Sequence, residues 1–167
     1  NLAAIDTTQI GGLTASQIAS LSATNLSALN ATSVAALNAT QVGGLSVSQL
    51  KGLSATDFAE LTNTQITGLT ASQLGALSAT NFSTIDATGI AGLDNTQLKG
   101  LTTTQVAGLS STDFGEFKDT QIAALATTQI AALSGTVITN LTTTNLDSFN
   151  ETQIGALTAT QIDNLST

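Results

Sequence analysis

The chain lacks the residues on which much of protein chemistry depends. Its 167 residues include no Cys, Pro, His, Met, Trp or Tyr. Without Cys there are no disulfides and no thiol chemistry, and without His and Cys the usual zinc ligands and the base of a nucleophilic triad are missing. The pairs Gly11-Gly12 and Gly43-Gly44 belong to a regular pattern rather than to a phosphate-binding loop. We therefore expect no enzyme activity and no cofactor.

Positive charge is also scarce. Three Lys and Arg residues face 11 Asp and Glu residues, which gives a net charge of −8. Nucleic acids and anionic membrane surfaces are both bound through clustered Lys and Arg. The sequence contains no run of 18 apolar residues, so no segment is predicted to span a bilayer. We therefore expect neither nucleic-acid binding nor membrane insertion.

What the chain does contain is an eight-residue repeat without insertion or deletion. Leu, Ile or Phe occupies every eighth residue from Ile5 to Leu165, and we number this residue position 1. A second apolar residue follows at position 6, from Ile10 to Ile162. The consensus is L-[ST]-x-T-Q-I-x-[AG], with Ser or Thr at position 4 in all 20 octads that contain it. Such a repeat predicts a solenoid, in which stacked units bury a continuous Leu/Ile core.

Local signals favour one very short helix per octad. Position 2 is Ser, Thr, Asp or Asn at 19 of 21 sites, which is typical of a helix N-cap. Position 5 is Gln, Asn or Asp at 18 of 21 sites, close to the capping-box pattern. One long helix would rotate its apolar stripe at each repeat, and a plain strand would put positions 1 and 6 on opposite faces. We predict an all-α solenoid with helices over positions 3 to 7, and a β-solenoid is the alternative.

The remaining positions suggest how each unit ends and which side faces outward. Twelve of the 14 Gly residues lie at position 7 or 8, where we expect them to end the helix and reverse the chain. Positions 3 and 7 vary most, so we expect position 3 to be the most exposed and positions 1 and 6 the least. We interpret residues 1–167 as a single octapeptide-repeat solenoid and a slice of a longer array. Because neither end has a polar cap, we expect end-to-end stacking or further repeats.

Two polar columns allow a functional and a structural interpretation. The position-4 hydroxyls would either bind an ordered surface such as ice or carbohydrate, or bond backbone groups of the solenoid. We favour the backbone interpretation, because Ala never replaces these residues in 20 octads. The position-5 Gln column would either associate laterally or complete the capping box, and we favour the capping box.

A third candidate involves acidic and aromatic residues that recur along the chain. Asp57 and Glu60 recur as Asp113 and Glu116, and each pair offers few oxygens for Ca²⁺, so we favour solvated charges over a weak Ca²⁺ site. Residues 21–60 resemble residues 77–116 at an offset of 56 residues. We predict a superhelical turn of between three and four octads, and duplication of a seven-octad block without geometric meaning is the alternative. The marked residues would then share one side of the rod as a lateral-contact face: Asp57, Phe58, Glu60, Asn81, Phe82, Asp113, Phe114 and Glu116.

The repeat also resembles a known kind of protein. Residues 125–133 closely, and residues 68–90 in outline, are similar to the octapeptide repeat regions of giant bacterial surface or secreted proteins. The resemblance covers the whole chain and implies an extracellular or cell-surface location. Our leading hypothesis is a structural spacer or filament-forming segment that contacts other copies end to end or laterally. The rival hypothesis is an adhesin, or an ice- or carbohydrate-binding surface, that uses the Thr column.

Overall fold

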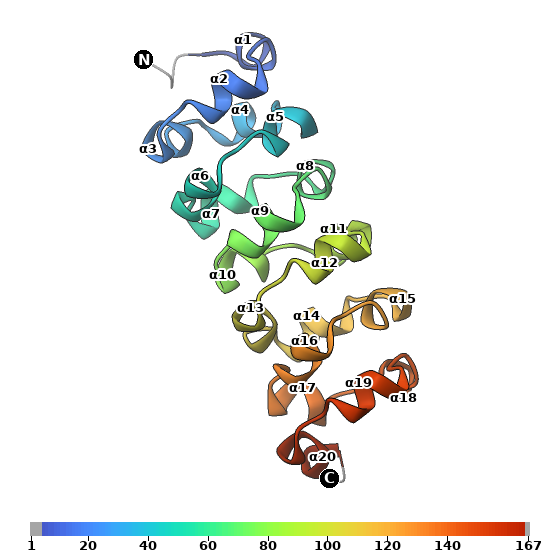
Figure 1. Ribbon diagram of the computed structural model, residues 1–167. Coiled ribbons are helices and arrows are strands. Elements are labelled where there is room, and N and C mark those ends of the chain that lie inside the picture. The colour runs from blue at the N-terminus through green and yellow to red at the C-terminus, as the bar shows by residue number, and fades with distance from the viewer. Residues whose placement is uncertain (1–4, 166–167) are drawn as a thin grey trace.

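A computed structural model describes residues 5–165 as an elongated stack of short helices, whose two ends lie at opposite ends of the stack (Figure 1). The described residues form 20 helices and contain no strand, so the predicted all-α repeat solenoid is confirmed and the β-solenoid alternative is wrong. The helices are α1 (Thr7–Gly11), α2 (Ala15–Ala19), α3 (Ala23–Ser27), α4 (Ala31–Ala35), α5 (Ala39–Gly43), α6 (Val47–Gly52), α7 (Ala55–Ala59), α8 (Asn63–Thr67), α9 (Ala71–Ala76), α10 (Ala79–Phe82), α11 (Ala87–Gly92), α12 (Asn95–Lys99), α13 (Thr103–Ala107), α14 (Ser111–Gly115), α15 (Asp119–Ile122), α16 (Thr127–Ala131), α17 (Gly135–Thr139), α18 (Thr143–Asp147), α19 (Glu151–Gly155) and α20 (Ala159–Leu165).

Each helix begins where the capping pattern predicts. At α5, the Gln41 N–H donates to Asn38 Oδ1 at 3.0 Å, and the Asn38 N–H donates to Gln41 Oε1 at 2.8 Å. Asn38 itself is extended, with φ −82° and ψ 164°. Lys118 and Ala126 provide no side-chain cap, yet their backbone N–H groups still donate to the Gln three residues later, at 2.9 and 2.7 Å. The reciprocal bond from position 5 therefore persists where the cap itself is lost.

The helices do not end as predicted. No residue in the described part of the chain has a positive φ, and Gly12, the C-cap of α1, is right-handed at φ −79°. The chain leaves the helix because position 1 is extended, as at Leu77 with φ −62° and ψ 148°. Glycine is needed instead for close approach, since a Cβ on Gly44 would lie 2.7 Å from the Ala15 Cβ. The expected role of glycine in reversing the chain is therefore wrong.

The solenoid completes a turn after three to four octads. Each helix packs against the one three helices later, as in the series α2, α5, α8 and α11. Side-chain bonds between turns reach back 28 and 31 residues, which is between three and four octads. This confirms the predicted superhelical period, and the offset of 56 residues corresponds to two turns.

Positions 1 and 6 form the core along the rod, as predicted. The position-6 residues Leu50, Leu74 and Leu98 are 0% exposed, and Leu69 at position 1 is 2% exposed. Position 3 is not the most exposed position, and that prediction is wrong. Its side chains pack beneath position 8 of the next turn, as Ala15 does beneath Gly44. The most exposed column is position 4, which is exposed in all 20 octads.

Candidate functional site

The position-5 amides join each turn to the preceding one. Gln105 Nε2 donates to the Leu74 carbonyl at 2.7 Å and to the Leu77 carbonyl at 2.9 Å, 31 and 28 residues earlier. The first carbonyl belongs to position 6 and the second to position 1. The same kind of inter-turn bond is made by Gln41, Gln49, Gln65, Gln73, Asn81, Gln97, Gln121, Gln129, Gln153 and Gln161. We call this set of bonds the amide ladder.

Each glutamine of the ladder serves two hydrogen-bond systems. Gln105 Oε1 accepts the Thr102 N–H at 2.8 Å, which caps its own helix, while Nε2 donates to the turn before. The Gln105 side chain is 3% exposed, so it has little access to water as a substitute partner. The predicted capping role of this column is therefore confirmed, but the contact between turns was not predicted.

One sequence signal for the ladder was present. A capping box accepts Glu as readily as Gln, because only an acceptor oxygen is needed. Position 5 is nevertheless never Glu at any of its 21 sites. A glutamate carboxylate could accept the capping N–H but could not donate to the preceding turn. The absence of Glu therefore indicates that this position needs a donor.

The position-4 hydroxyls are not structural, contrary to the backbone interpretation. All 20 residues are exposed, and their hydroxyls make no hydrogen bond within residues 5–165. Position 4 lies two residues before position 6, about 200° around the helix, and so faces away from the core. The capping hydroxyl is the one at position 2, such as Thr14 Oγ1, which accepts the Gln17 N–H at 3.2 Å. The fold therefore uses one hydroxyl column and leaves the other to solvent.

The exposed hydroxyls wind around the rod. Because a turn holds between three and four octads, successive position-4 residues point between a quarter and a third of a turn apart. Hydroxyls on one side of the rod are therefore separated by the spacing of packed helices, about 8–10 Å per turn. This arrangement is not the flat, closely spaced face that would match an ice surface.

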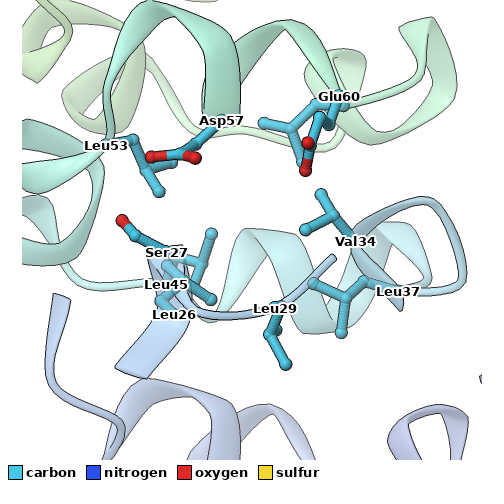
Figure 2. A pocket seen from close by; sticks show the side chains of 10 residues that line it. Leu26, Ser27, Leu29, Val34, Leu37, Leu45, Leu53, Asp57 and Glu60 are labelled. Carbon is cyan, nitrogen blue, oxygen red and sulfur yellow. The ribbon is translucent and has the colours of Figure 1, made fainter. Parts of the chain in front are cut away.

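The acidic residues Asp57 and Glu60 line a small cavity between two turns. Figure 2 shows both carboxylates on the upper side of the gap, with Leu29 and Leu37 opposite. The space open to the centre of a water molecule is about 10 Å³, roughly what one water needs. Glu60 Oε2 is buried and has no hydrogen-bond partner among the described residues. Burial raises the pKa of the Glu60 carboxyl, and the negative charge of Asp57 raises it further.

The same arrangement recurs two turns later. Glu116 Oε2 is also buried without a hydrogen-bond partner in the described part of the chain. Burial raises the pKa of Glu116, and the charges of Asp113 and Asp86 add to this effect. Asp57 and Asp113 replace the ladder glutamine: each accepts a capping N–H from its own helix, but a carboxylate has no N–H to donate. Within residues 5–165 no group of three or more His, Cys, Asp or Glu side chains could hold a metal ion.

The predicted lateral-contact face is corrected by the burial of its aromatic members. Phe58, Phe82 and Phe114 are each 1% exposed and belong to the core, because they occupy position 6. Asn81 is 4% exposed, and its Nδ2 donates to the Leu53 carbonyl at 3.1 Å as part of the ladder. The structure does bring these marked octads near one another, since α7 packs against α10. Only the carboxylates of the face reach solvent in part.

Two further findings concern known structures and membranes. None of the described helices is long and apolar enough to cross a membrane. Comparison of the chain with protein-family models, with curated proteins and with solved structures finds no match.

Proposed function

We propose that this chain is a structural spacer in a secreted or cell-surface bacterial protein, and that its partner is another copy of itself. The rod holds its ends apart, and its length is set by the number of octads. The bacterial and extracellular parts of this proposal rest on the resemblance of the repeat.

The observation that carries the proposal is the repetition of one contact along the rod. The amide ladder forms at 28 residues' separation from Gln41 to Gln161, so each turn is bonded to the next in the same way. Buried position-1 and position-6 side chains continue across every internal turn. Such an array lengthens by whole units without a new interface, which is what a spacer requires.

The spacer proposal is tested by measuring reach. The chain is placed between a cell-surface anchor and an outer fluorescent tag, in versions with its own length and with 7 or 14 octads added. Energy transfer from the tag to a membrane dye reports the distance. We expect the distance to rise by equal steps for each seven octads. A tag that stays at the same distance in all three versions would rule the spacer function out.

A second function is favoured by the exposed hydroxyls. Their position is Ser or Thr in 20 of 20 octads, although the fold makes no hydrogen bond to them. We propose that they contact a carbohydrate polymer, whose hydroxyls offer both donors and acceptors along a flexible chain. The test is retention on polysaccharide columns of the chain and of a variant with Ala at position 4 in α8 to α16. Equal retention of the two proteins would exclude this function.

A further inference from the structure

The two ends of the described solenoid carry the two halves of the amide ladder. We infer that the first turn of one copy binds the last turn of another, head to tail, through the same amide-to-carbonyl bonds that join internal turns. This inference rests on the proposed self-contact, but not on the spacer function. It names the surfaces, the polarity and the register of that contact.

The first turn supplies unused donors. Gln9 and Gln17 are exposed, whereas the ladder glutamines such as Gln105 are buried. Their Oε1 atoms accept the N–H groups of Asp6 and Thr14 at 3.0 and 2.8 Å, so both amides are already held in the ladder orientation. Their Nε2 groups have no hydrogen-bond partner within residues 5–165. Two oriented donors therefore face outward from this end.

The last turn supplies unused acceptors and an uncovered core. The carbonyls of Phe149 and Leu157, both at position 1, accept no hydrogen bond from the described residues. The position-6 residues Ile154 and Ile162 are 40% and 46% exposed, whereas Ile122 is 0% exposed. Each of these features is what an internal turn shows when the turn that follows it is removed.

The spacing of the ladder fixes the register between the two ends. An internal glutamine bonds carbonyls three residues apart, at positions 6 and 1, and neighbouring glutamines are eight residues apart. Gln9 of one copy then reaches the Leu146 and Phe149 carbonyls of the other. Gln17 reaches those of Ile154 and Leu157, and the exposed Ile154 is covered. Because the two surfaces differ, the contact is heterologous and propagates into a filament.

The test compares the chain with a variant that keeps the helix caps but loses the donors. Gln9→Glu with Gln17→Glu retains an acceptor oxygen for each capping N–H and places a carboxylate against the partner's carbonyls. The control, Thr64→Glu with Thr104→Glu, adds the same charge at exposed position-4 sites in the middle of the rod. In sedimentation velocity, we expect the chain and the control to form concentration-dependent oligomers. The double Gln variant should need about a hundredfold higher concentration or more, because each junction buries unpaired charge.

Polarity is tested by cross-linking. Ser16→Cys and Thr160→Cys variants, which carry the only thiols, are treated with a flexible bis-maleimide separately and mixed. Ser72 and Thr96 have the same spacing within α9 and α12, which pack together, so the double Cys variant at these sites is the internal positive control. We expect dimers only in the mixture of the two single variants.

The outcomes separate the inference from the proposals on which it rests. A chain that is monomeric at every concentration overturns both the self-contact and this inference, while the reach measurement still decides the spacer function. A double Gln variant that associates like the chain, or Ser16→Cys dimers formed without its partner, overturns this inference alone.

Discussion

At the scale of the residue, position 5 links the folding of a unit to the stacking of units. The amide oxygen of Gln121 accepts the Lys118 N–H at 2.9 Å, and its nitrogen donates to the Ile90 and Leu93 carbonyls at 2.8 and 2.9 Å. A single side chain therefore satisfies groups that short helices and their connections would otherwise leave unpaired. This explains why a turn of five-residue helices holds together without a single disulfide or proline.

The first prediction concerns the charge state of the ladder. Changing Gln105 to Glu keeps the cap acceptor but buries a carboxylate beside two carbonyls, which should lower the free energy of unfolding by about 2–4 kcal/mol. The same change at the exposed Gln17 should alter it by less than about 0.5 kcal/mol. Urea unfolding of the two variants measures the difference. Equal losses would mean that the inter-turn bonds add nothing to the cap.

The second prediction concerns the outer hydroxyls. Thr64 and Thr104 make no hydrogen bond with the described chain. Replacing either with Ala should leave stability unchanged or raise it by up to about 0.7 kcal/mol, because Ala is the better helix former. Thr62→Ala is the contrast, since it removes a cap and should cost about 0.5–2 kcal/mol. Thermal unfolding compares them, and a marked loss at Thr64 or Thr104 would restore a structural role for position 4.

The third prediction concerns the two buried carboxylates. Because the folded-state pKa of Glu60 and Glu116 is raised above 4.5, the fold favours their protonated forms. Their destabilising effect is therefore absent well below pH 4.5, grows as the pH rises through the raised pKa, and is complete at neutral pH. Glu60→Gln with Glu116→Gln should raise stability by about 1 kcal/mol at neutral pH, since an amide donor also faces the carbonyls, and by less at pH 4.

The matched control for that experiment is Glu151→Gln. Glu151 is exposed and begins α19 rather than lining a cavity. Thermal midpoints of the three proteins are measured from pH 4 to pH 8. A gain that is constant across this range in the Glu60 and Glu116 variant, or equal to that of the control, would contradict the prediction.

At the scale of the element, the sequence determines where each helix starts better than how it meets its neighbours. Capping is local, so Asn38 and Gln41 could be assigned from three residues' separation alone. The partner of Gln41 in the preceding turn, the Leu13 carbonyl, lies 28 residues away, and the octad pattern repeats too evenly to single it out. The outer Thr column was misassigned because invariance within the chain was taken as a sign of burial. The glycines were misassigned because the packing of two turns leaves no trace in one octad.

The fourth prediction restores a missing cap. Ala126 is the N-cap of α16 and makes no side-chain hydrogen bond, whereas Ser46 holds the same place in α6 and accepts the Gln49 N–H at 3.2 Å. Changing Ala126 to Ser should raise the free energy of unfolding by about 0.5–2 kcal/mol. The reverse change, Ser46→Ala, should lower it by a similar amount. Urea unfolding measures both, and a change of the same sign in the two variants would argue against the capping account.

At the scale of the whole molecule, the ladder makes the octad the unit that can be removed. Every ladder bond spans a fixed number of residues, so deleting complete octads leaves each remaining glutamine in register with another pair of carbonyls. Deleting part of an octad moves position 1 and position 6 out of the core for all glutamines that bond across the cut. The offset of 56 residues adds that residues 109–116 can take the place of residues 53–60, with Asp113 and Glu116 replacing Asp57 and Glu60.

The last prediction follows from this register. Deleting residues 69–76 or residues 53–108 should keep the helical circular dichroism per residue and a single cooperative transition. Deleting only residues 69–72 should lower the free energy of unfolding by more than about 3 kcal/mol, because several buried amides lose their partners together. Small-angle scattering gives a second readout: the 56-residue deletion should shorten the rod by two turns, or about 16–20 Å at the spacing of packed helices. If the four-residue deletion is tolerated as well as the eight-residue one, the turns are not held in register by the ladder, and apolar burial alone stacks them.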